Sequence, residues 1–169
     1  MDIKKMLADQ KKLDDRILSN ASIEKYPLKN MKLALLVELG ELANEWQGFK
    51  YWKKHKKINR EKLLGEFADC LHFALSLENY YESKGNELEG DFSKDDFNSI
   101  SDFLEKNKPT LIDIIEGFFS TYNTVLNYGG EVLAYIIGLG MMLGISKEEM
   151  EQAYYKKNKV NYKRQEEGY

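Results

Sequence analysis

The sequence is poor in residues that interrupt helices or cross-link chains. Its 169 residues include two prolines and a single cysteine, Cys70. One cysteine excludes an intramolecular disulfide framework and fits a reducing compartment, where it packs as a small apolar side chain. Because proline breaks helices and the chain has few runs typical of β-strands, this composition favours an all-α fold.

Long apolar runs and an excess of positive charge are also missing. No stretch reaches the roughly 18 uncharged apolar residues that cross a bilayer, and the N-terminal MDIKKMLADQKK lacks the apolar centre of a secretion signal. The formal net charge of −3 gives no reason to expect nucleic acid or an anionic membrane as a partner. We therefore expect a cytoplasmic protein whose residues 1–169 form one domain.

The spacing of apolar residues predicts a bundle of about six to seven helices. The main helices are expected over residues 2–19, 30–47, 60–82, 110–128, 131–144 and 147–159. A short helix capped by Ser93 and Asp96 should end near residue 106, and Ser146 with Glu149 forms a capping box before the last helix. Gly138, Gly140 and Gly144 indicate close helix–helix approach, and Gly140 could equally mark a bend.

Two acidic clusters lie on helices that are otherwise apolar on nearly every side. Glu38, Glu41 and Glu45 share one stripe of the second expected helix, and Glu66 and Asp69 share a stripe of the third. A helix that is apolar almost all round belongs inside a protein, where an ionised carboxylate costs several kcal/mol unless it is compensated. No Arg or Lys stands within either cluster. Divalent cations are the simplest compensation, and oxygen ligands without Cys or paired His favour Mg²⁺ or Mn²⁺ over Zn²⁺.

Gln10 and Asp14 interrupt the apolar face of the first expected helix. They can form a polar gap at the rim of that helix, or they can face a cavity and hydrogen-bond a ligand. A carboxamide offers both a donor and an acceptor, which suits the edge of a nucleobase. The pattern leaves both interpretations open.

Three further features have both a plain and a functional interpretation. The segment GFKYWKKHKKINR is rich in lysine and aromatic residues, which suits a solvated loop or a site for anions and rings. His72 lies in an apolar helix, where a lone histidine is more often a satisfied core residue than a ligand. The tail KKNKVNYKRQEEGY suits a frayed polar terminus or an arm that closes over phosphates.

Taken together, these motifs resemble a known family. Glu38-Leu-Gly-Glu41 followed by Glu66-Phe-Ala-Asp69 resembles the all-α NTP pyrophosphatases, which include MazG-type enzymes and the dimeric dUTPases. The dimeric dUTPase branch is favoured by Gln10 with Asp14, by the GFKYW segment, by Asp69-Cys-Leu-His72-Phe, and by the ending from Asn161 to Tyr169. The resemblance covers nearly the whole chain, and the short length is similar to phage and prophage members.

The resemblance implies hydrolysis of dUTP, and of dUDP, to dUMP with release of pyrophosphate or phosphate. Two or three Mg²⁺ ions, or Mn²⁺ in their place, would be held by Glu38, Glu41, Glu66 and Asp69. Glu38 or Glu41 would also orient or deprotonate the attacking water, and Glu45 would lie behind the ligands. The uracil end would be lined by Gln10, Asp14 and His72, with Tyr51 or Trp52 as a stacking face. The phosphates would be held, within or across a homodimer, by Lys157, Asn158, Asn161, Arg164 and Tyr169.

Other functions fit parts of the sequence. A related pyrophosphatase could prefer dCTP or a non-canonical NTP. A ferritin-like di-iron bundle needs two Glu-x-x-His pairs, whereas neither histidine here follows a glutamate by three residues. A regulatory protein that acts on a repressor, as some phage relatives are thought to do, is the alternative outside enzymes, and the sequence identifies no such partner.

Overall fold

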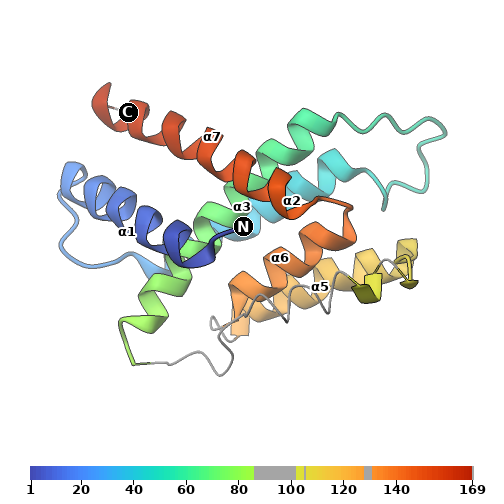
Figure 1. Cartoon of the computed structure of the whole chain (residues 1–169), viewed down its shortest axis with the longest axis horizontal. Helices are drawn as coiled ribbons and strands as arrows, with labels where there is room; N and C mark the ends of the chain where they lie inside the picture. The colour runs from blue at the N-terminus through green and yellow to red at the C-terminus, as the bar shows by residue number, and fades with distance from the viewer. Residues whose placement is uncertain (86–101, 105, 128–130, 169) are drawn as a thin grey trace.

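The structure is a computed structural model that describes residues 1–85, 102–104, 106–127 and 131–168. It contains α1 (Ile3–Asn20), α2 (Leu28–Trp46), α3 (Arg60–Glu82), α5 (Leu111–Asn127), α6 (Val132–Met142) and α7 (Lys147–Glu166) (Figure 1). No strand occurs among these described residues, so the predicted all-α class is confirmed. The cap predicted at Ser93 and Asp96 lies outside them. None of the described helices combines the length and the apolarity needed to span a membrane.

Polar side chains set where several helices begin. The Asp2 carboxylate accepts from the Lys5 N–H at 3.0 Å before α1. The predicted capping box of Ser146 and Glu149 is present at the start of α7. Glu149 also binds the Arg60 guanidinium, which ties the start of α7 to the start of α3.

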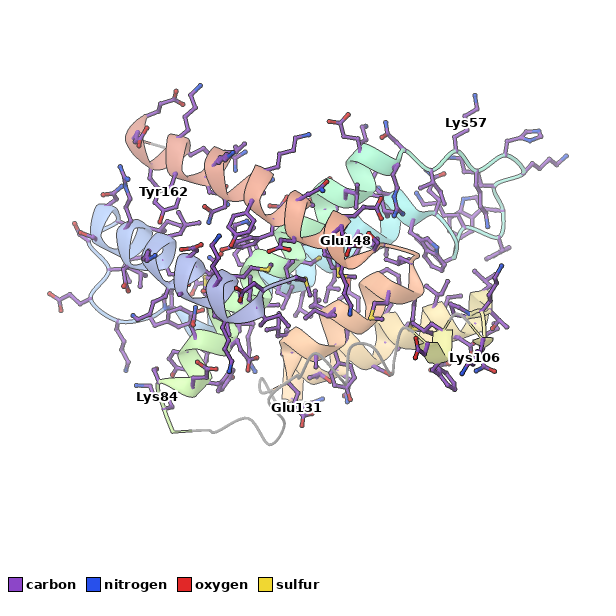
Figure 2. All side chains as sticks on the ribbon, in the orientation of Figure 1. Lys57, Lys84, Lys106, Glu131, Glu148 and Tyr162 are labelled. Carbon is purple, nitrogen blue, oxygen red and sulfur yellow. The ribbon has the colours of Figure 1, made fainter. Side chains whose placement is uncertain are left out.

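The longest helix, α3, lies at the centre of the bundle and packs against α1, α2, α6 and α7. Its buried residues include Phe67, Leu71 and Leu75, which are fully enclosed. Each such side chain contributes about 1.5–3 kcal/mol through burial. In contrast, charged residues labelled on the surface, such as Lys57 on the loop after α2, point away from the bundle (Figure 2). Because α3 is central, the side chains that it directs toward α1, α2 and α7 lie inside the protein, in contact with side chains of those helices.

One of the three glycines predicted to allow close helix contact does so. A Cβ on Gly140 would collide with the Phe67 ring of α3, whereas one on Gly138 would meet nothing within 4 Å. Gly144 has a φ of +72° and ends α6 in the left-handed conformation that glycine adopts most easily. The prediction was therefore right for Gly140 and wrong for Gly138.

Glu78 is a buried carboxyl on the side of α3 that meets α6. Its exposed fraction is 1%, and neither carboxylate oxygen has a hydrogen-bond partner of ordinary geometry among the described residues. Burial, followed by the like charge of Glu82, raises the pKa of Glu78 to about 7, and the nearby Leu133 N–H opposes this only in part. Glu78 is thus kept in its protonated form at mildly acidic pH.

We expect Glu78→Gln to remove a pH-dependent loss of stability. Because the folded pKa lies above the unfolded one, the stability associated with Glu78 is full below about pH 4.5 and is lost as pH rises to about 7. The loss has an upper bound of about 3 kcal/mol. Urea unfolding at pH 5, 6, 7 and 8 measures the free energy of unfolding. The difference in this free energy between the variant and the wild type should grow as the pH rises and then level off. Glu116→Gln, on the exposed side of α5, is the control, and a parallel pH profile for Glu78→Gln would contradict the prediction.

Candidate active site

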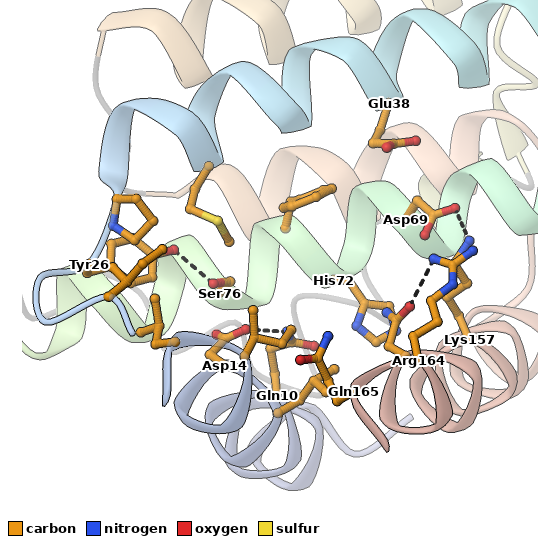
Figure 3. A pocket seen from close by; sticks show the side chains of 18 of the residues that line it. Gln10, Asp14, Tyr26, Glu38, Asp69, His72, Ser76, Lys157, Arg164 and Gln165 are labelled. Carbon is orange, nitrogen blue, oxygen red and sulfur yellow. Dashed lines mark hydrogen bonds and ion pairs between the residues drawn. The ribbon is translucent and has the colours of Figure 1, made fainter. Parts of the chain in front are cut away.

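A cavity of about 590 Å³ lies between α1, α2, α3 and α7. Its wall on the α2 and α3 side is acidic, and its far end carries polar side chains from α1 and α3 (Figure 3). The wall from α7 is basic and polar. The polar residues that line it are Gln10, Asp14, Tyr26, Glu38, Glu41, Glu66, Asp69, His72, Ser76, Lys157, Asn161, Arg164 and Gln165.

The acidic wall brings together carboxylates from two helices. Oxygen atoms of Glu38, Glu66 and Asp69 all lie within 4.8 Å of one another. Glu41 lies outside this group of three but lines the same cavity. Spacing of three residues on each of two packed helices gives this convergence, as the sequence predicts.

Burial and neighbouring like charges raise the pKa values of Glu38 and Glu66. Burial, followed by the charges of Asp69, Glu41 and Glu66, raises the pKa of Glu38 to about 7. Burial and the charge of Glu41 likewise raise the pKa of Glu66. This repulsion would be relieved by a cation, and a donor set made only of carboxylate oxygens fits Mg²⁺ or Mn²⁺.

A lysine lies within the acidic wall, which the sequence did not predict. Lys157 Nζ of α7 donates to Asp69 Oδ2 at 2.5 Å. Burial still raises the pKa of Asp69, although this hydrogen bond and the Lys157 charge oppose the rise. The acidic cluster is therefore compensated in part by the protein itself.

The polar end of the cavity begins with Gln10 and Asp14 on α1. Gln10 is buried, and its Nε2 donates to Asp14 Oδ1 at 2.7 Å. Its Oε1 accepts from the Tyr154 hydroxyl at 3.4 Å, so both ends of the carboxamide are oriented by neighbours. Burial raises the pKa of Asp14 to about 6. The pair therefore lines a cavity rather than a helix rim, and its hydrogen bonding to a ligand stays a prediction.

His72 borders the same end with one nitrogen engaged and the other buried without a partner in the described part of the chain. Its Nε2 lies 3.3 Å from the Tyr154 carbonyl oxygen, so Nε2 carries the proton and donates. Its Nδ1 is buried and has no partner among the described residues. Burial lowers the pKa of His72 to about 4, which keeps the ring neutral and leaves Nδ1 as a hydrogen-bond acceptor.

Two hydroxyl groups at this end were missed by sequence reasoning. Tyr26 and Ser76 share a hydrogen bond of 2.8 Å. Ser76 also hydrogen-bonds the Asp14 carboxylate, which partly opposes the rise in the pKa of Asp14 caused by burial. Ser76 follows His72 by one helical turn and could have been found from that spacing. Tyr26 lies in the connection before α2, where no pattern marked it.

Three predicted site residues are not brought to the cavity. Tyr51 and Trp52 are 89% and 63% exposed on a loop that leaves the bundle beyond the ends of α2 and α3 (Figure 1), so within this chain they do not form its stacking face. Asn158 is buried and donates to the Tyr154 hydroxyl. It is one residue from Lys157, which turns it about 100° around the helix and toward the core. Tyr169 lies outside the described residues.

The tail is a helix rather than a frayed terminus. α7 continues to Glu166, seven residues past the predicted end at 159. Lys157, Asn161 and Arg164 therefore share one face that lines the cavity. Asn20 Nδ2 at the end of α1 donates to Gln165 Oε1 at 3.1 Å, which links the C-terminal ends of α1 and α7.

Comparison with known proteins places this architecture in a family. No curated protein matches the chain. A family model described as dUTPase matches residues 2–169, which is nearly the whole sequence. The chain therefore belongs to this all-α dUTPase family, and its enzymatic activity is that of a dUTP diphosphatase.

Proposed function

We propose that the enzyme hydrolyses dUTP to dUMP and pyrophosphate, and dUDP to dUMP and phosphate, with two or three Mg²⁺ ions held by its acidic wall. The convergence of Glu38, Glu66 and Asp69 oxygens within 4.8 Å supports this most directly. Glu41 would complete the ligand set from the same cavity, and Mn²⁺ would substitute for Mg²⁺.

The carboxylates would also prepare the attacking water. Divalent ions held there would supply positive charge against the polyphosphate and would make a bound water more acidic. Glu38 or Glu41 would then accept its proton or hold it in line with the phosphorus.

The polar end of the cavity would select uracil. Gln10 Nε2 has a second N–H beyond the one given to Asp14, and this can donate to uracil O4. His72 Nδ1 is an unpartnered acceptor that suits the uracil N3–H. Asp14 would act by fixing the orientation of Gln10, supported by the 2.7 Å bond between them.

The basic face of α7 would hold the phosphates through Lys157, Asn161 and Arg164. We expect Arg164→Ala to raise KM for dUTP by roughly 10–100-fold, because a guanidinium bond to phosphate is charge-assisted. Lys163→Ala is the matched control, since Lys163 neighbours Arg164 but lies on the exposed side of α7. Steady-state kinetics should show near wild-type KM for the control. Equal KM values in both variants would contradict a phosphate contact by Arg164.

We also propose that the enzyme is a homodimer. Ile112, Phe119 and Leu126 of α5 are spaced by seven residues and are 63%, 63% and 61% exposed. They form one apolar stripe, and exposed apolar stripes of this kind usually mark an interface. Leu33 and Val37 on α2, which packs against α5, are exposed as well.

We expect Phe119→Asp to shift the protein from dimer to monomer, because a charge in an apolar interface is left without compensation. Light scattering after size exclusion measures the mass directly. Ser120→Asp places the same charge on the next, exposed residue and should leave the dimer intact. A monomeric wild type would refute the dimer, and a dimeric Phe119→Asp would refute this stripe as its interface.

The proposed activity is tested by assaying the purified protein against all deoxynucleoside triphosphates with Mg²⁺. We expect dUTP to have the highest kcat/KM and the products to be dUMP and pyrophosphate. Equal kcat/KM for dCTP would favour a pyrophosphatase with broader base preference. Several further statements stay predictions. They are the single domain over residues 1–169, the cytoplasmic location, the absence of nucleic-acid and membrane partners, the similarity to phage enzymes and the action on a repressor.

A further inference from the structure

Lys157 and Asp69 form a close ion pair inside the active-site cavity. The Nζ–Oδ2 distance is 2.5 Å, and the two side chains are 25% and 17% exposed. The pair joins α7 to α3 across 88 residues of sequence. Such a short charge-assisted bond holds the ammonium firmly on one carboxylate oxygen (Figure 3).

The oxygen that Lys157 binds belongs to a carboxylate of the proposed metal site. Asp69 is one of the three residues whose oxygens lie within 4.8 Å of one another. Mg²⁺ binds carboxylate oxygens at about 2.0–2.1 Å and keeps a strict octahedral shell. An ammonium hydrogen-bonded to one oxygen of that carboxylate occupies space beside this shell and repels the incoming ion. A divalent ion and Lys157 therefore compete for Asp69.

A released Lys157 has a second place to go. Asn161 and Arg164 follow it on the same face of α7, and all three line the cavity. Lysine carries its charge on a flexible four-carbon stem, so a change of rotamer can move the ammonium from the carboxylate toward the cavity. Substrate phosphates bound there would provide the negative charge that Asp69 had supplied.

We propose that Lys157 competes with the divalent ion for Asp69 and passes to the substrate's phosphates when the ion binds. This inference rests on the proposed metal site. It makes metal and nucleotide binding cooperative, because each removes an obstacle to the other: the ion frees the lysine for phosphate, and the phosphate keeps it from returning. Nucleotide-free enzyme should then bind the ion weakly.

The first test is Mn²⁺ affinity without nucleotide, measured by calorimetry on wild type, Lys157→Met and Lys156→Met. Lys156 is the matched control because it carries the same charge one residue earlier and pairs with the exposed Glu61 at 2.9 Å. We expect Lys157→Met to bind Mn²⁺ roughly tenfold more tightly and the control to match wild type. Unchanged or weaker binding by Lys157→Met would overturn the proposal.

A second measurement separates displacement from simple repulsion, which would also tighten binding. In ¹H–¹⁵N spectra of the lysine ammonium groups, the signal missing from Lys157→Met identifies Lys157. Saturating Mg²⁺ should move this signal toward that of a free lysine, and an unmoved signal would overturn displacement. Both tests omit nucleotide, so they can fail independently of the proposed function. If the wild type binds Mg²⁺ and hydrolyses dUTP while the Lys157 signal does not move, only this inference is refuted. Wild type that fails to hydrolyse dUTP with Mg²⁺ refutes the proposed function instead.

Discussion

Replacing Glu66 with Gln should lower kcat for dUTP by roughly 10²–10⁴-fold, which corresponds to about 3–5 kcal/mol of lost transition-state stabilisation. An amide oxygen binds a divalent ion more weakly than a carboxylate and brings no negative charge. Glu66 belongs to the group of three whose oxygens lie within 4.8 Å, so its loss should weaken the whole site. Chelation of metal by EDTA should have an effect of the same order on the wild type.

The fold should survive this substitution. Burial and the charges of Glu41 and Asp69 raise the pKa of Glu66, so its ionised form is disfavoured in the metal-free protein. Removing that charge relieves repulsion, and thermal unfolding without metal should occur at an equal or higher temperature. Glu61→Gln provides the control, since Glu61 is on the same helix but is exposed and pairs with Lys156. Full dUTP hydrolysis by Glu66→Gln, or in EDTA, would refute the acidic wall as the catalytic centre.

Sequence reasoning succeeded where a local pattern determines the outcome. Helical periodicity gave the described helices before α7 to within two residues at each end. The spacing of Glu38 and Glu41, and of Glu66 and Asp69, could be predicted to face a common space because both helices are apolar elsewhere. In each case the period of a helix fixes which residues share a face.

Prediction from the sequence failed where the position of a side chain depends on contacts between distant segments. Lys157 reaches Asp69 across 88 residues, and no local pattern reports which helix α7 packs against. The resemblance predicted Tyr51 or Trp52 as a stacking face on the loop that follows the acidic helix, yet both side chains are largely exposed to solvent. The resemblance placed Asn158 among the phosphate ligands, whereas the register of α7 turns its side chain toward Tyr154. The errors at Lys157 and at the aromatic loop share one cause, since nearness in sequence is not nearness in space, whereas the error at Asn158 follows from the register of α7.

Base selection gives the second large expected effect, a preference of about 10²–10⁴-fold for dUTP over dCTP. Uracil presents an acceptor at O4 and a donor at N3, and cytosine reverses both. Gln10 offers an N–H and His72 offers the Nδ1 lone pair, a pair that matches uracil. Each mismatch leaves a buried polar group unpaired at roughly 1–3 kcal/mol, and cytosine would create two.

Gln10→Ala should therefore reduce the ratio of kcat/KM for dUTP to that for dCTP by about 10–100-fold. The substitution also removes partners from Asp14 and Tyr154, so it should lower stability. The ratio is unaffected by that loss, because both substrates are measured on the same folded fraction of one variant. Lys11→Ala, whose lysine pairs with Asp15 on the exposed side of α1, should keep the wild-type ratio. A wild-type enzyme that treats dUTP and dCTP equally would exclude this end of the cavity as the base-selecting site. An unchanged ratio in Gln10→Ala would assign the selection to His72 instead, whose neutral ring and unpartnered Nδ1 could then distinguish the two bases at N3 alone.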